Sequence, residues 1–183
     1  MQPDVSSFAE PVSRVLAEHG HRLLPLTRSG KCFEAEVAEL RETPERTLFP
    51  DAREGRGALA GLILLLGCWD QAHDVAQAIE SSDGSFWHGI LHRMEPSSWN
   101  SNYWFGRVGE HPVFPSLLAA ARRILDQNPG TGWVLPASWN PPIFTKWCVE
   151  AREAPGTDRE QVATAIQKAE WELLFNWCAS KSA

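Results

Sequence analysis

Residues 158–179 read DREQVATAIQKAEWELLFNWCA, and no other segment of the chain predicts a helix so clearly. Asp158 is placed to cap the start of this helix. An apolar stripe recurs at helical spacing and is expected to face the core: Val162, Ile166, Ala169, Leu173 and Trp177. Further apolar side chains fall on nearly the opposite side of the helix: Trp171, Phe175 and Cys178. We therefore expect a central helix that is covered on two faces.

Helical periodicity also dominates the rest of the chain, where no alternation of apolar and polar residues extends beyond a few positions. We predict an all-α fold, a single domain over residues 1–183 built as a helical bundle or helical-hairpin array, with the last helix long and largely buried. The charged region 41–56 contains prolines and glycines and is expected to be a mobile loop. The predicted helices span residues 8–18, 31–41, 55–66, 71–81, 85–94, 100–108, 115–127, 142–152 and 158–179.

Charge and hydropathy argue against several classes of protein. The 183 residues carry a net charge of -6 with dispersed positive charges, so we expect no nucleic-acid partner. The longest apolar run, residues 58–68, is far shorter than the roughly 20 residues of a membrane span, so we expect no membrane contact. The first residues lack the pattern of a signal peptide, which predicts a cytoplasmic protein. The scattered cysteines are expected to be buried thiols, in agreement with a reducing compartment: Cys32, Cys68, Cys148 and Cys178.

A stripe of titratable residues follows the pattern H-x-x-x-H-x-x-E over His88, His92 and Glu95. At helical spacing these three side chains share one narrow sector, beside the apolar face of their helix. Two imidazoles and a carboxylate suit zinc, iron, nickel or manganese, and His73 on the preceding helix can add a fourth ligand. Gly89 stands where a zincin has glutamate, which excludes that type of protease. The alternative is a hydrogen-bonded structural network.

Two residues that follow the stripe are candidates for catalysis. His111 opens the segment HPVFP, where proline holds it on a fixed turn, and it is suited to general acid–base chemistry or to bracing the loop. Arg107 follows three aromatic residues and can orient a carboxylate or phosphate of a substrate, or pair with nearby acidic residues. Arg93 has the same two alternatives.

Tryptophan is abundant in this chain, with nine residues, and several aromatics lie close to the histidine stripe. An aromatic pocket there would bind a planar or apolar small molecule, whereas the alternative is ordinary core packing. Asn100 is expected to cap a helix and can also contact a ligand. The predicted substrate-binding residues are Trp87, Asn100, Tyr103 and Trp104, and the pocket would also include Trp99.

These motifs resemble those of an uncharacterised family of bacterial and fungal proteins. The resemblance is carried by WHGILHR at residues 87–93, Glu95-Pro96, Asn100, YWF at 103–105, RVG at 107–109 and HPVF at 111–114, with EWELLF at 170–175. It covers residues 67–111 well and implies a shared helical fold without an established activity. Met94 and Ser97 depart from the family pattern, in which arginine and aspartate are expected at these two positions.

Two functions of different classes remain open from the sequence. The first is a metal-assisted hydrolase or lyase for a small acidic or aromatic molecule, in which the stripe holds a divalent ion, His111 transfers protons and Arg107 orients the substrate. The second is a non-enzymatic module that binds a ligand or a protein, in which the same polar residues form a structural network.

Overall fold

The computed structural model describes residues 8–28 and 30–181, and this part of the chain contains helices and no strand. An isolated antiparallel bridge joins Ala52 to Lys181. The all-α prediction is confirmed. The helices are α1 (Glu10–His19), α2 (Glu34–Glu42), α3 (Glu45–Leu48), α4 (Gly55–Leu65), α5 (Trp69–Gln77), α6 (Ser82–Arg93), α7 (Trp99–Val108), α8 (Phe114–Asp126), the short 3-10 helix η2 (Pro129–Thr131), α9 (Pro141–Arg152) and α10 (Asp158–Ala179).

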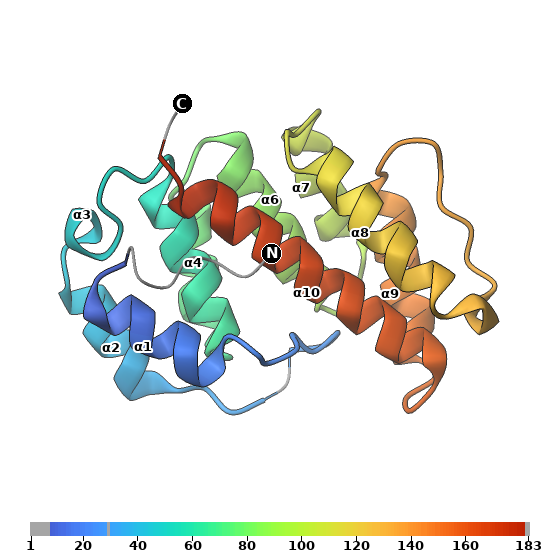
Figure 1. The fold of residues 1–183 in the computed structure, drawn as a ribbon, viewed down its shortest axis with the longest axis horizontal. Coiled ribbons are helices and arrows are strands. Elements are labelled where there is room, and N and C mark those ends of the chain that lie inside the picture. The colour runs from blue at the N-terminus through green and yellow to red at the C-terminus, as the bar shows by residue number, and fades with distance from the viewer. Residues whose placement is uncertain (1–7, 29, 182–183) are drawn as a thin grey trace.

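The long C-terminal helix α10 crosses the middle of the molecule, between α4 on one side and α8 and α9 on the other (Figure 1). Its most buried side chains lie on the face of Trp171 and Phe175, whose rings stack at 5.2 Å, and the Trp171 indole donates a hydrogen bond to the Gly61 carbonyl at 2.8 Å. Leu173 and Trp177 are only half-buried. The predicted central position is correct, but the stripe that contains Leu173 and Trp177 is not the deepest face.

Helix α4 approaches its neighbours closely because it carries glycines. A Cβ atom at Gly61 would lie 2.7 Å from the Trp87 ring, and one at Gly57 would lie 2.9 Å from the Cys178 sulfur. The Trp87 side chain fills this space and is completely buried. Trp87 thus packs α6 against α4. Because its ring is buried, it cannot contact a ligand at the surface, contrary to its predicted role in substrate binding.

An ion pair is buried between α6 and α10. Arg93 donates from Nη2 to Oε2 of Glu170 at 2.6 Å, and both side chains are almost fully excluded from solvent. The Arg93 guanidinium also lies over the rings of Phe105 and Phe144. Arg93 therefore ties two helices together, and the sequence-based alternative in which it binds a substrate anion does not hold.

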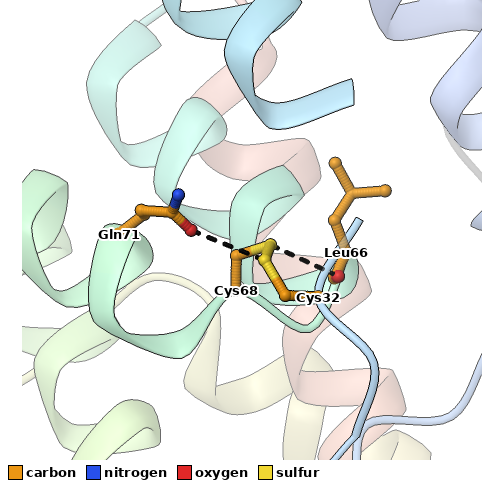
Figure 2. Close-up of a disulfide and its surroundings, with 4 residues drawn as sticks. All are labelled: Cys32, Leu66, Cys68 and Gln71. Carbon is orange, nitrogen blue, oxygen red and sulfur yellow. Dashed lines mark hydrogen bonds between the residues drawn. A yellow bond between two sulfur atoms is a disulfide. The ribbon is translucent and has the colours of Figure 1, made fainter. Parts of the chain in front are cut away.

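Two of the four cysteines form a disulfide, which corrects the prediction of four thiols. Cys32 lies in the segment before α2, and Cys68 directly precedes α5 (Figure 2). Cys148 and Cys178 are free and buried, as predicted. The sequence missed the bridge because its cysteines are 36 positions apart and only the tertiary fold brings them together. Two of the four cysteines therefore remain as the buried thiols that are expected in a reducing compartment.

The region 41–56 is more structured than expected. It contains α3, and the side chains of Leu48 and Phe49 belong to the core, at 0% and 2% exposure. Leu48, at the end of this short helix, is buried because the transfer of an apolar side chain out of water is favourable even inside a charged segment. Within the described residues, none of the helices combines the length and the apolar character needed to cross a membrane.

Helices α5 and α6 form a hairpin, and α7 packs on α6. Ser81 accepts a hydrogen bond from the Gly84 amide at the start of α6. Gly89 allows α7 to approach, because a Cβ atom there would lie 2.9 Å from the Phe105 ring, and the Ser101 hydroxyl donates to the Gly89 carbonyl at 2.8 Å. These contacts fix the face of α6 that carries His88 and His92 between α5 and α7.

Candidate metal centre

Three imidazoles converge where α5 meets α6. His73 comes from α5, and His88 and His92 lie one helical turn apart on α6. One nitrogen of each ring lies within 4.8 Å of one nitrogen of the other two, and the Nε2 atoms of His73 and His88 are 3.2 Å apart. His88 and His92 are buried, whereas His73 is half-buried. The predicted pair on one helix is thus joined by the third histidine from its neighbour.

Tryptophan rings cover two sides of this cluster. Trp69 stacks on His73 with ring centroids 5.0 Å apart, and Trp104 stacks on His88 at 4.1 Å. The Trp69 indole donates a hydrogen bond to the Leu91 carbonyl at 3.0 Å, which fixes the ring against α6. The aromatic walls hold the imidazole planes in place and reduce the contact of the cluster with water.

Glu95 and Asn100 both contact His92. The Glu95 carboxylate lies 2.8 Å from Nδ1 of His92, and the Asn100 amide nitrogen lies 3.2 Å from Nδ1 and 3.3 Å from Nε2. Because an ionised carboxylate only accepts, we assign the ring proton to Nδ1, which donates it to Glu95. Nε2 is then unprotonated and accepts from the Asn100 amide at 3.3 Å. The geometry makes Glu95 the residue that orients His92, which differs from its predicted role as a direct ligand.

The environment lowers the pKa of two of the three imidazoles. Burial, followed by the nearby His73 and His92, lowers the pKa of His88 to about 4. Burial also lowers the pKa of His73, and His92 contributes to that shift. A neutral imidazole offers a lone pair to a metal ion, whereas a protonated one repels the ion. His73 and His88 are therefore in the protonation state that metal binding requires at neutral pH.

Arg28 connects the cluster to the segment before α2, although no sequence pattern predicts a role for this residue. Its guanidinium lies 3.6 Å from the centre of the Trp69 ring, 2.6 Å from an Asp70 oxygen and 3.6 Å from a Glu95 oxygen. Arg28, Trp69 and His73 thus form a stack of three layers. Arg28 lies in a loop where no periodicity marks it, so only the tertiary structure reveals the contact.

The predicted substrate-binding aromatics divide between the cluster and the surface. Trp104 lies against His88, whereas Tyr103 is 49% exposed and contacts the Trp104 ring edge-on at 5.5 Å. Trp99 is 72% exposed and stacks on Tyr103. The guanidinium of Arg107 lies 5.5 Å from the Trp104 ring centre and is exposed. Helix α7 therefore carries aromatic rings from the cluster outward to solvent.

His111 occupies a different environment from the one predicted for a catalytic base. Its Nε2 lies 2.8 Å from an Asp83 oxygen, and the Trp177 indole donates to the same oxygen at 3.0 Å. Nδ1 of His111 accepts from the Val113 amide at 3.2 Å. Both ring nitrogens are thus engaged in a buried network that joins α6, α10 and the turn before α8. These bonds support the bracing role that was the alternative.

Comparisons with known proteins identify no relative: no family model, no curated protein and no solved structure matches the chain. The resemblance to an uncharacterised bacterial and fungal family stays a prediction.

Proposed function

We propose that the chain is a metalloprotein whose divalent ion is held by His73, His88 and His92. The convergence of three imidazoles from two helices carries this proposal. Nitrogens bound tetrahedrally at 2.0–2.1 Å from zinc lie about 3.3 Å from one another. The 3.2 Å between Nε2 of His73 and Nε2 of His88 is close to that spacing. An ion would thus fit between these two rings with little movement.

The ligand set favours an ion that accepts imidazole. Zinc, iron and nickel suit nitrogen ligands, and manganese, which prefers oxygen, suits the set less well. Glu95 would orient His92 through its Nδ1–H, as carboxylates do in many zinc sites. Zinc bound by three histidines keeps a position for water and lowers the pKa of that water to about 7. Such a centre supports a metal-assisted hydrolase or lyase.

The surroundings of the cluster suggest a small acidic or aromatic substrate. Trp104 and Tyr103 offer ring faces and edges, and the exposed Arg107 beside Trp104 offers a cation for a carboxylate or phosphate. Asn100 lies next to Nε2 of His92 and would contact a molecule bound at the ion. Arg107 would thus orient the substrate, but the contacts of His111 leave no free ring nitrogen for proton transfer.

Elemental analysis of protein purified without a histidine tag tests this function. We expect one ion per chain and loss of that ion in a His88→Ala/His92→Ala variant, with His21→Ala as the matched control because His21 is exposed. Glu95→Gln should weaken zinc binding about 10- to 100-fold without removing a ligand. Cobalt substituted for zinc should give the spectrum of a tetrahedral site. Metal-free protein whose melting temperature responds neither to zinc nor to a chelator would refute the proposal.

The exposed pair Trp99 and Tyr103 favours the second candidate function, a non-enzymatic binding module. These rings stack with centroids 5.9 Å apart at the surface, where large apolar side chains mark contact sites. In that case a Trp99→Ser/Tyr103→Ser variant would lose a binding partner and keep its metal content. If the native chain instead turns over a small acidic or aromatic molecule and the His88→Ala/His92→Ala variant does not, the result would favour the metal-assisted hydrolase or lyase over the binding module.

A further inference from the structure

A cavity of about 680 Å³ lies beside the start of α5, next to the metal centre but not among its histidines. Trp69 lines the cavity and also stacks on His73. The disulfide forms part of the same wall, because both Cys32 and Cys68 line the cavity. A small molecule in this space would therefore lie beside the disulfide-bonded residues.

The local structure holds the two sulfurs together at the cavity. Gly67 has a φ of +78°, which lets the chain turn sharply from α4 into α5. A Cβ atom there would lie 2.5 Å from the Lys31 carbonyl, so the glycine also lets the segment that carries Cys32 approach. A backbone hydrogen bond from the Phe33 amide to the Leu66 carbonyl at 3.1 Å joins the two segments.

The two cysteines differ in their access to a reagent. Cys32 is half-buried, whereas Cys68 is 3% exposed and directly precedes the first residue of α5. An attacking thiolate thus meets Cys32 first, and Cys68 leaves. The N-terminus of a helix favours a negative charge, so the position of Cys68 stabilises the leaving thiolate.

Both sulfurs have polar partners that suit the reduced state. The Cys32 sulfur lies 3.7 Å from the Gln71 side-chain oxygen, and the Cys68 sulfur lies 3.6 Å from the Leu66 carbonyl oxygen, the two contacts drawn as dashed lines in Figure 2. A disulfide sulfur has no proton to donate, but a thiol does. After reduction the two sulfurs move apart, and each of these oxygens is placed to accept an S–H hydrogen bond.

Cations border the Cys32 end of the cavity. The guanidinium of Arg22 and the ammonium of Lys31, which directly precedes Cys32 in the chain, lie 4.7 Å and 5.1 Å from the centre of the Phe33 ring. Arg28 is neutralised by Asp70, and Glu34 is the other carboxylate in the lining. In a chain with a net charge of -6, this end of the cavity favours an anion.

We propose that Cys32–Cys68 is a thiol–disulfide exchange site for small thiols that carry a carboxylate. The thiolate attacks the Cys32 sulfur, a mixed disulfide forms at Cys32, and the bond to Cys68 breaks, so that Cys68 leaves as a thiolate. A second thiolate then attacks the sulfur of the bound thiol and releases it as a small disulfide, while Cys32 takes up a proton as a thiol. Two small thiols are oxidised and one protein disulfide is reduced.

The two remaining cysteines do not compete. Burial raises the pKa of Cys148 to about 12 and raises that of Cys178 well above its usual value. The exchange site is independent of the proposed metal centre, so either proposal can fail alone.

Mass spectrometry of the folded oxidised chain tests the exchange. The two probe thiols, mercaptopropionate and cysteamine, carry opposite charges. For each thiol, the rate of reaction with the protein disulfide is divided by the rate of reaction with a small neutral disulfide, which corrects for the intrinsic reactivity of the thiol. We expect mercaptopropionate to react about fivefold faster after this correction at low ionic strength, and the difference to shrink as salt is added. The trapped adduct should map to Cys32. In a Cys68→Ser variant, the oxidised form of mercaptopropionate should label Cys32 stably.

The controls separate charge and access from folding. Lys31→Gln should reduce the preference for mercaptopropionate, whereas Lys146→Gln, which removes an exposed lysine from α9, should not. Circular dichroism verifies that each variant is folded. Three results would overturn the proposal: reduction only at the rate of global unfolding, equal corrected rates for the two thiols, or an adduct that maps to Cys68.

Discussion

Removal of one partner from the buried pair between Arg93 and Glu170 should destabilise the protein strongly. The charged groups are 2.6 Å apart, and their side chains are 1% and 0% exposed. Arg93→Met leaves the Glu170 carboxylate buried without its cation, and Glu170→Gln leaves the guanidinium without its anion. Breaking a buried pair in this way costs about 3–5 kcal/mol. For a chain of this size, that corresponds to a fall of about 6–20 °C in melting temperature.

The pH dependence distinguishes the two variants. Burial raises the pKa of Glu170 from 4.5, against the opposing effect of Arg93. Without Arg93, the folded state holds the proton on Glu170 more strongly than the unfolded state does. The native chain shares the loss that begins at the unfolded value of 4.5, so the stability of Arg93→Met relative to the native chain should decrease as the pH rises above the raised pKa of Glu170 in the native fold. Glu170→Gln has no carboxylate at this position, so its deficit should not show this dependence.

Urea denaturation at several pH values measures these differences. The double variant Arg93→Met/Glu170→Leu should recover to within about 1 kcal/mol of the native chain, because the rings of Phe105 and Phe144 accept apolar side chains. Arg107→Met is the control: this exposed arginine should change stability by less than about 0.5 kcal/mol. A double variant that is no more stable than Arg93→Met alone would refute the reasoning.

Two further predictions concern the helices that carry the histidines. Gly89→Ala places a Cβ atom 2.9 Å from the Phe105 ring, whereas Gly106→Ala meets nothing within 4 Å. Both substitutions gain the same helix propensity, so the difference between them reports the clash with Phe105. Thermal denaturation should show Gly89→Ala to be less stable than Gly106→Ala by about 1–3 kcal/mol. Equal stabilities of the two variants would contradict the close packing of α7 on α6. The lowered pKa of His88 means that the metal-free protein should lose stability as the pH falls from 6.5 to about 4, because the unfolded state takes up the proton first. In a urea titration over this range, His88→Gln should show a smaller dependence, and an unchanged slope would contradict the shift.

Helix phase was sufficient to place part of the site. His88 and His92 lie four positions apart, so any regular helix puts them on one face, and the structure keeps them there. Phase did not reveal the role of Glu95, because spacing gives a shared face but not the atom that a carboxylate contacts. The prediction that His73 joins them depended on the preceding helix folding back rather than on helix phase, and the structure places its ring beside His88.

Local periodicity by itself determined the helical class and the position of the last helix, because backbone hydrogen bonding within a helix and the burial of one face need only neighbours in the chain. Only the tertiary structure decided the contacts between distant residues, which depend on packing rather than on spacing. It joined Cys32 to Cys68, buried Arg93 against Glu170 and held His111 on Asp83. The packing of α5 on α6 likewise brings His73 to the stripe of His88 and His92 and forms a cluster of three imidazoles.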